Sequence, residues 1–184
     1  RQMCIRDRFR SSLREFLERE VRPNINSWEK QKKIPRYIWE KMGEMGFLGL
    51  SYPEEYGGAN LDFFYEVIFN EEIGRMNSGG FVVTQQSVQY MASPYIFKYG
   101  SSILKAKYLP GLCSGLQVGA LGLTEPGAGS DALGSMATTA KREGDVYVLN
   151  GRKIYITNGP VADVLLVYAK TDLGKGAHGI SAFI

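Results

Sequence analysis

Residues 122–143 read GLTEPGAGSDALGSMATTAKRE, and this stretch decides between two kinds of fold. Gly127, Gly129 and Ala132 match the spacing G-x-G-x-x-A, which in dinucleotide-binding folds places a phosphate at the start of a helix. No amphipathic helix comes after the glycines here, because adjacent threonines and a Gly-Asp pair favour strand and turn. The stretch therefore predicts a glycine-rich loop on a β-scaffold, and the chain also lacks the Gly-Lys-Ser/Thr sequence of a nucleotide-triphosphate loop.

Such a loop has two interpretations. Its exposed backbone N–H groups and hydroxyls could lie against a planar ligand or bind an anion. Alternatively, it is a sharp turn whose glycines take positive φ angles. The residues of the loop alone favour the turn.

A second stretch with the same ambiguity is RKIYITNG, residues 152–159. An alternating strand would place Tyr155 and Thr157 on one face and Ile156 on the other. An aromatic ring beside a hydroxyl could then face a planar ligand and donate hydrogen bonds to its heteroatoms. The alternative is the ordinary end of a strand.

The chain on either side of the loop divides into two domains. Residues 9–117 carry helical periodicity: Asp62 is a suitable N-cap for the apolar stripe after it, and a longer helix is predicted over residues 81–99 with a break at Pro94. Residues 118–184 are rich in β-forming residues, with turn signals at Gly144-Asp145 and at Asn150-Gly151, the stronger hairpin signal. The fold class is therefore α+β: a helical domain at 9–117, then an antiparallel, barrel-like β-domain at 118–184.

Both ends of the chain suggest a fragment. Residues 1–8, RQMCIRDR, resemble the translation of a sequencing-library adapter, so we expect a non-native tail; an ordinary polar tail is the alternative. Without Arg1, Arg6, Arg8 and Asp7, the net charge falls from +3 to +1. Ile184 lies inside an apparent strand, so we expect the β-domain to be incomplete.

Composition narrows the function classes. Two cysteines make no disulfide framework and favour a reducing compartment, and one histidine argues against a zinc site. No apolar run reaches the ~20 residues of a membrane helix, so no membrane span is expected. The near-neutral charge gives no reason to expect nucleic-acid binding.

The glycine loop and its partner stretch together resemble the acyl-CoA dehydrogenase family. The resemblance runs from Phe9 to Ile184, and its specific motifs are LTEPGAGSD and NGRKIYITNG, preceded by IPRYIWEKMGEMGFLGLSYPEEYGG. It implies an N-terminal helical domain, a middle β-domain and a C-terminal four-helix domain that has no counterpart here. Relatives often carry a histidine where this chain has Thr84-Gln85-Gln86-Ser87, so the resemblance leaves the substrate open.

By this resemblance, the cofactor is FAD and the substrate an acyl-CoA thioester. The implied cofactor-binding residues are Leu121, Leu123, Thr124, Tyr155, Ile156 and Thr157, and the implied substrate-binding residues are Gly129 and Ser130. The family reaction is α,β-dehydrogenation, with electrons passed to an electron-transfer flavoprotein. The glutamate base belongs to the C-terminal domain, so no catalytic residue is assigned in this chain, which alone is expected to be inactive and to bind FAD weakly or not at all.

The resemblance further implies a homotetramer when full length, located in the bacterial cytoplasm or, in a eukaryote, in the mitochondrial matrix. Two alternatives stay open. One is an acyl-CoA oxidase or flavin monooxygenase of the same superfamily. The other is a catalytically inactive acyl-CoA-binding scaffold.

Overall fold

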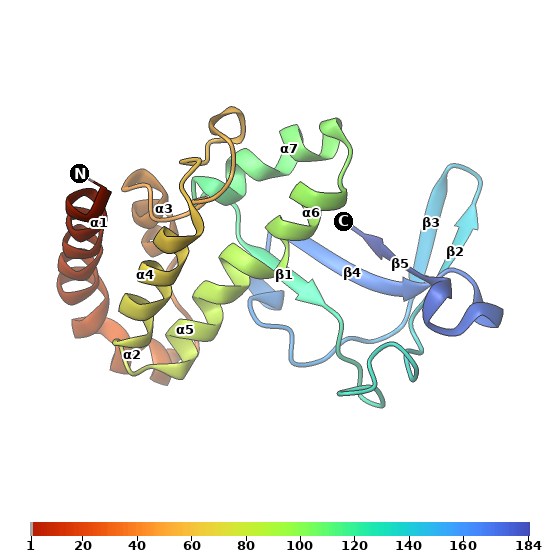
Figure 1. The fold of residues 1–184 in the computed structure, drawn as a ribbon. Coiled ribbons are helices and arrows are strands. Elements are labelled where there is room, and N and C mark those ends of the chain that lie inside the picture. The colour runs from red at the N-terminus through yellow and green to blue at the C-terminus, as the bar shows by residue number, and fades with distance from the viewer. Residues whose placement is uncertain (1) are drawn as a thin grey trace.

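A computed structural model describes the backbone of residues 2–184 and the side chains of residues 4–184. Helices form the N-terminal part and a sheet forms the C-terminal part (Figure 1). The helical segments before the sheet are α1 (Gln2–Phe16), η1 (Leu17–Val21), η2 (Arg22–Asn24), α2 (Ile25–Gln31), α3 (Arg36–Glu44), η3 (Glu54–Tyr56), α4 (Phe63–Gly74), α5 (Gly79–Gln86), η4 (Ser87–Met91), α6 (Ser93–Tyr99) and α7 (Ser102–Cys113). No described helix combines the length and apolar character needed to cross a membrane.

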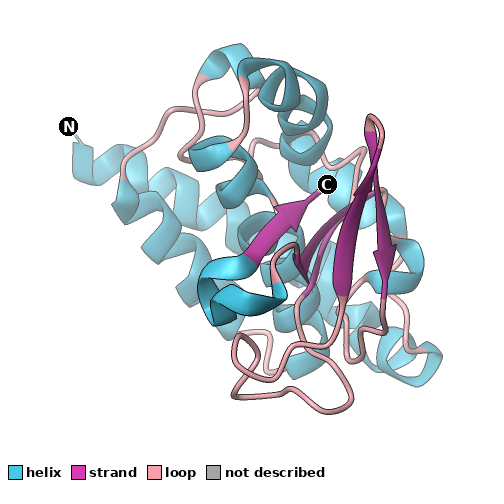
Figure 2. Cartoon of the chain, turned by 90° about the vertical axis from the view of Figure 1, so that its right-hand side faces the viewer, coloured by secondary structure: helices cyan, strands magenta, loops and turns pink. Residues whose placement is uncertain are grey.

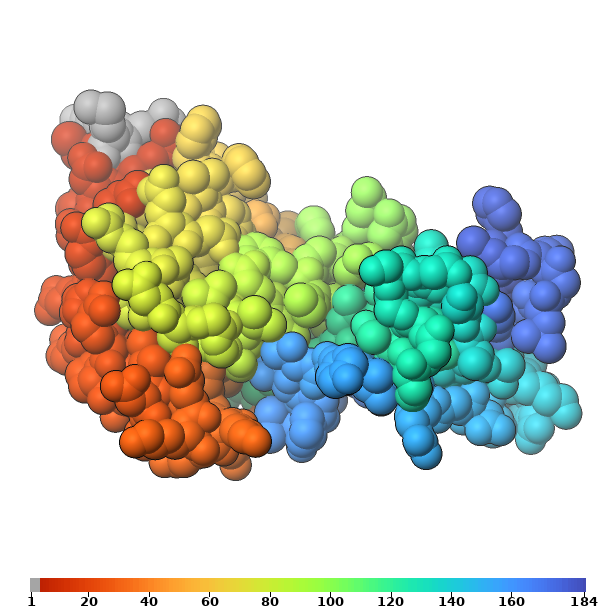
Figure 3. All heavy atoms as spheres, turned by 90° about the horizontal axis from the view of Figure 1, so that it is seen from below, coloured from red at the N-terminus to blue at the C-terminus, as the bar shows by residue number. Residues whose placement is uncertain are grey.

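The strands are β1 (Gly119–Gly122), β2 (Thr139–Glu143), β3 (Val146–Asn150), β4 (Val164–Lys170) and β5 (Ile180–Phe183), with the short helices η5 (Gly159–Val161) and η6 (Leu173–Gly179) between them. The predicted order of a helical part followed by a sheet is confirmed. A space-filling view shows the first helices at one end of the molecule and the strands at the other (Figure 3). Helix α7 ends at Cys113 and β1 begins at Gly119, so the change of structure falls between these residues.

The N-terminus of α4 is capped by Asp62, as the sequence predicts. Its Oδ1 accepts a hydrogen bond from the Phe64 N–H at 3.0 Å, and its Oδ2 pairs with Arg6 Nη2 at 2.7 Å. The Arg6 guanidinium also lies 4.7 Å from the centroid of the Phe64 ring. Residues 2–8 thus form the first turns of α1, which contacts α4; that they are non-native stays a prediction.

Replacing Asp62 with alanine is expected to lower the free energy of unfolding by about 1 kcal/mol, because the first turn of α4 loses its side-chain acceptor. Asp62→Asn keeps an acceptor oxygen and removes only the charge, so it should cost no more than about 0.5 kcal/mol. Urea denaturation of both variants measures the difference. Equal losses would assign the effect to the Arg6 ion pair instead of the cap.

The predicted helix over residues 81–99 is divided into three segments. Helix α5 continues as a π-helical turn, η4, and α6 starts anew with Pro94 in its first turn. A proline is tolerated there because the first N–H groups of a helix have no intrahelical partner. Segment η4 lies against β1 and continues α5, and through it the helical part reaches the predicted site.

The main hydrophobic core lies among the helices. Trp39 of α3 is 2% exposed and stacks on Phe81 of α5, with ring centroids 6.0 Å apart and an interplanar angle of 14°. Gly115 closes the end of α7 against α3: its φ is +74°, and a Cβ there would lie 2.0 Å from the Trp39 carbonyl oxygen. Only glycine fits both constraints.

The sheet is mixed and open. Strand β4 is central: β1 runs parallel to it with Gly119 opposite Val164, and β5 runs antiparallel with Ile180 opposite Lys170. Strand β2 meets β4 in parallel only at Thr139, and β3 pairs antiparallel with β2. Figure 2 views the molecule from the end that holds the strands, with the helices behind the sheet. The sheet does not close into a barrel.

The prediction of antiparallel pairing holds for β2–β3 and β4–β5 but is wrong for the two pairs β1–β4 and β2–β4. Residue alternation reports which face of a strand is buried but not the direction of its neighbour. Between β1 and β4 the chain makes the β2–β3 hairpin and returns to run in the same direction, which makes the β1–β4 pair parallel.

Of the two predicted turns, the one at Gly144-Asp145 is confirmed and the hairpin at Asn150-Gly151 is wrong. Gly144 has a φ of +64° and joins β2 to β3, which ends at Asn150. Packing explains why residue 151 is a glycine, since a Cβ there would lie 2.3 Å from Thr138 Oγ1. The residues directly after Gly151 do not form a strand.

Candidate active site

Two segments far apart in the sequence meet at the end of β1. Leu121 lies within β1, and Leu123 and Thr124 come after its end; all three are half-buried. The Thr124 carbonyl oxygen accepts a hydrogen bond from the Ile154 N–H at 2.9 Å. The structure therefore brings the predicted loop and the predicted partner stretch into direct contact.

A buried ion pair fastens these segments together. Glu125 is 4% exposed; its Oε2 accepts the Ala137 N–H at 2.6 Å and its Oε1 accepts the Thr138 N–H at 3.0 Å. Lys153 Nζ donates to Glu125 Oε1 at 2.8 Å and to the Leu123 carbonyl oxygen at 3.0 Å. One carboxylate thus joins both ends of the glycine loop, and one ammonium joins the loop to the second segment.

The charge state of Glu125 is set by these contacts. Burial opposes its ionisation, but the Lys153 ammonium and the backbone N–H groups outweigh burial and lower the pKa of Glu125 to about 2. The carboxylate is therefore charged at neutral pH. Sequence reasoning missed this pair. The available signal was one acid and one base in two segments that were expected to be neighbours.

Tyr155 has the least favourable backbone in the second segment. Its φ is +55°, in the left-handed region that costs non-glycine residues about 1–2 kcal/mol, and its side chain is 89% exposed. The predicted alternation of Tyr155, Ile156 and Thr157 along a strand is wrong, because these residues form no strand: Tyr155 lies in a bend and Thr157 in a turn. Ile156 and Thr157 are half-buried. An exposed ring held in a strained conformation is typical of ligand sites.

The segment is also anchored to the helical part. The Ser87 hydroxyl of η4 donates to the Thr157 carbonyl oxygen at 3.4 Å. Asn158 Nδ2 donates to the Thr84 carbonyl oxygen at 3.2 Å and to that of Gly119 at 3.5 Å. Helix α5, η4 and β1 therefore hold the turn in place.

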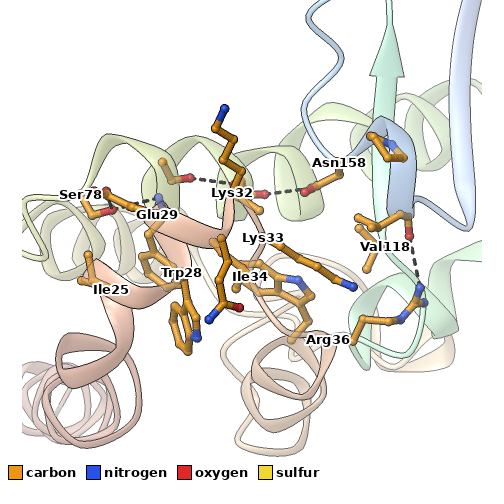
Figure 4. A pocket seen from close by; sticks show the side chains of 17 residues that line it. Ile25, Trp28, Glu29, Lys32, Lys33, Ile34, Arg36, Ser78, Val118 and Asn158 are labelled. Carbon is orange, nitrogen blue, oxygen red and sulfur yellow. Dashed lines mark hydrogen bonds between the residues drawn. The ribbon is translucent and has the colours of Figure 1, made fainter.

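A cavity of about 760 Å³ flanks this anchor (Figure 4). It opens between α2, α5 and the segment at Asn158, with Trp28 and Phe81 in its apolar wall and Lys32 and Lys33 among its polar residues. None of the predicted cofactor-binding or substrate-binding residues lines it. Nor do His, Cys, Asp or Glu side chains in the described part of the chain form a group of three able to hold a metal ion.

The glycine loop leaves open space where side chains would be. A Cβ added at Gly127 or Gly129 would meet no atom within 4 Å, and neither residue has a positive φ. The interpretation in which these glycines take positive φ is therefore wrong. Ser130 and Gly129 are exposed, and the loop is closed by a short bridge between Glu125 and Ala128. The missing side chains leave room for a ligand against the backbone.

Comparison with known proteins identifies the family. The sequence profile described as "Acyl-CoA dehydrogenase, N-terminal domain" matches residues 6–116, and that described as "Acyl-CoA dehydrogenase, middle domain" matches residues 120–184. The chain belongs to the acyl-CoA dehydrogenase family. The resemblance of the two motifs is thereby confirmed at the level of the family.

Individual members of the acyl-CoA dehydrogenase family agree with this. The chain is 42% identical to a 3-(aryl)acrylate reductase of Clostridium sporogenes, covering 95% of this chain and 46% of that protein. It superposes on the acyl-CoA dehydrogenase of Geobacillus kaustophilus with a TM-score of 0.90 at 44% identity, over 96% of this chain and 46% of the other. An acyl-CoA dehydrogenase of Bacillus anthracis complexed with FAD gives a TM-score of 0.85 at 36% identity, over 98% of this chain and 30% of the other. The chain spans about half the length of the curated relatives it matches.

Proposed function

We propose that this chain forms the helical and middle parts of an FAD-dependent acyl-CoA dehydrogenase. The whole enzyme removes a proton from the α-carbon and a hydride from the β-carbon of an acyl-CoA thioester. The observation that carries the proposal is the Glu125–Lys153 ion pair, because it holds the glycine loop beside the segment that contains Tyr155 and Thr157. Delivery of electrons to an electron-transfer flavoprotein, and assembly as a homotetramer, belong to this proposal.

The residues present fit a flat cofactor with polar edges. Open space over Gly127 and Gly129 lets a ligand approach the backbone, and the exposed Tyr155 ring is free to cover one face of a ring system. Hydroxyls of Thr124 and Thr157 would donate to the ring edge, each bond contributing about 1 kcal/mol net. Apolar contacts would come from the side chains of Leu121, Leu123 and Ile156. When bound, FAD accepts the hydride that leaves the acyl β-carbon.

The substrate side of the site is the loop itself. The Ser130 hydroxyl would donate a hydrogen bond to the thioester substrate. Gly129, which has no side chain, would let the substrate approach the main chain. Both residues are exposed in the loop, between the two ends that Glu125 holds. Fixing both ends limits the conformations of the loop before the substrate binds, which lowers the entropy cost of binding.

None of the glutamates in this chain is assigned as the base that removes the α-proton. Glu125 is the glutamate closest in sequence to the predicted site, but its low pKa makes it a weak base at neutral pH. Its oxygens are also occupied by Lys153 and two backbone N–H groups. The proposal therefore places the base in the half of the enzyme that this chain does not match.

Flavin content tests the proposal. The purified 184-residue chain is expected to bind FAD weakly or not at all and to show no dehydrogenation of acyl-CoA with an artificial electron acceptor. Joined to the C-terminal part of the Geobacillus kaustophilus relative, it should retain FAD, measured as visible flavin absorbance per protein. Thr157→Val in this chimera should weaken FAD binding by roughly fivefold, the equivalent of one hydrogen bond.

Two outcomes would contradict the proposal. Tight stoichiometric FAD on the 184-residue chain alone would show that the second half is not needed for the site. A chimera that circular dichroism shows to be folded but that holds no flavin would show that these residues do not form a flavin-binding surface.

A further inference from the structure

A second cavity, of about 550 Å³, lies in the helical part, and none of the predicted cofactor-binding or substrate-binding residues lines it. It is lined by residues of α4, of the loop before η3, of η4 and of α6. Four aromatic side chains, Tyr52, Phe63, Tyr90 and Phe97, contribute to its wall, and the one acidic residue of the wall is Glu66. We call this cavity the Glu66 pocket. Its volume is within the ~300–1,000 Å³ usual for small-molecule sites.

Glu66 is unusual because it is buried and only half of its carboxylate is satisfied. Its residue exposure is 8%, and its Oε2 accepts hydrogen bonds from Gln89 Nε2 at 3.1 Å and from the Tyr90 hydroxyl. Burial and the neighbouring carboxylate raise the pKa of Tyr90, so this hydroxyl stays protonated and remains a donor. Among the described side chains, no hydrogen-bond donor reaches Glu66 Oε1. This oxygen is also not one of the fully buried polar atoms that lack a partner, so it remains in contact with solvent.

No cation neutralises Glu66 within the described residues. The ion pairs of the molecule with separations up to 4.0 Å do not include it. Lys98 lines the same pocket, but its ammonium lies 5.3 Å from the Tyr99 ring centroid. A largely buried carboxylate without a protein cation favours a positive charge beside it, so the solvent-accessible Oε1 offers a cationic ligand a contact within the pocket.

We propose that the Glu66 pocket binds a primary alkylammonium group carrying a short apolar substituent. The free Oε1 would accept an N–H from the ammonium in a charge-assisted hydrogen bond. The faces of Tyr90 and Phe97 would add cation–π attraction, and the apolar wall would bury the alkyl chain. This binding is independent of the flavin site and of the proposed dehydrogenation.

Titration of the ¹⁵N-labelled 184-residue chain with n-butylammonium, followed by amide chemical shifts, tests the proposal. Shifts are expected for residues of the Glu66 pocket, and n-pentanol, a neutral ligand of similar size, should bind at least roughly tenfold more weakly. Glu66→Gln preserves the shape and should weaken n-butylammonium binding by roughly tenfold or more. Glu44→Gln in α3 removes the same charge from an exposed position outside the pocket and should leave the dissociation constant unchanged.

Three results would overturn the proposal: no saturable binding of n-butylammonium, equal affinity for n-pentanol, or an unchanged dissociation constant in Glu66→Gln. Binding by Lys98→Met but not by the parent chain would also overturn it, since Lys98 would then be the partner of Glu66. If Glu66→Gln fails to fold, the affinities of the parent chain for n-butylammonium and n-pentanol still decide whether the pocket prefers a cationic ligand.

Discussion

The Lys153→Met variant is expected to lose about 3–5 kcal/mol of the free energy of unfolding. Methionine retains much of the aliphatic volume of lysine but leaves the Glu125 carboxylate, 4% exposed, without its cation. The Leu123 carbonyl oxygen loses a donor as well. Urea denaturation followed by circular dichroism measures the loss.

A matched control is Lys175→Met, which removes an exposed lysine paired with Asp172 at 3.3 Å. Both partners of that pair are largely in solvent, so the expected loss is below about 0.5 kcal/mol. The double variant Lys153→Met/Glu125→Gln should recover part of the stability, because it removes the uncompensated buried charge. A double variant no more stable than Lys153→Met would show that lost packing, and not charge, causes the effect.

The pH dependence of the same loss has a definite sign. The pKa of Glu125 is lowered from 4.5 to about 2 in the folded chain, so the contribution of the pair is complete above about pH 4.5 and disappears as the pH falls toward 2. The stabilities of the parent chain and of Lys153→Met should therefore converge as the pH is lowered from about 4.5 to about 2. A difference that stays constant over this range would contradict the assignment of the loss to the ionised carboxylate.

The Trp39→Ala variant is expected to lose about 3–5 kcal/mol by leaving a cavity in the helical core. Trp39 is 2% exposed, and its ring stacks on Phe81, which is also 2% exposed. The ring joins α3 to α5, and η4 continues α5 to the turn at Thr157. Urea denaturation measures the loss. Hydrogen exchange of the amides around Thr157 measures whether the destabilisation of the helical core extends to the candidate site.

Tyr37→Ala, in the same helix, is the control for this cavity. Tyr37 is 42% exposed, so its loss should cost no more than about 0.5–1 kcal/mol. Comparable losses for Trp39→Ala and Tyr37→Ala would contradict the assignment of the Trp39 loss to a core cavity, because alanine is a better helix former than either aromatic residue and helix propensity cannot cause a loss.

Much of the fold could be predicted from local sequence signals. Asp62 caps α4 because its side-chain oxygen reaches a backbone N–H two residues away, a contact that depends only on neighbouring residues. Pro94 interrupts the helix predicted over residues 81–99 for an equally local reason. The loop at Gly127 and Gly129 could be separated from a dinucleotide fingerprint because no helix comes after it.

The candidate site was predictable only in part. The motifs pointed to two segments that the folded chain brings together, where the Ile154 N–H donates to the Thr124 carbonyl oxygen. The assignment of FAD and acyl-CoA to individual residues, from Leu121 to Thr157, stays a prediction. The local structure of the second segment was predicted wrongly, because Tyr155 adopts a left-handed conformation that β-forming residues do not indicate.

Residue types and their spacing along short stretches were enough to predict the α+β class and to single out the two segments of the candidate site, and the resemblance of their motifs pointed to the family. The parallel pairing of β1 with β4, the Glu125–Lys153 ion pair and the half-satisfied Glu66 emerge only in the folded chain. These features depend on contacts between residues distant in the chain. Their energies depend on burial, and burial of a charged group is not visible until the chain has folded around it.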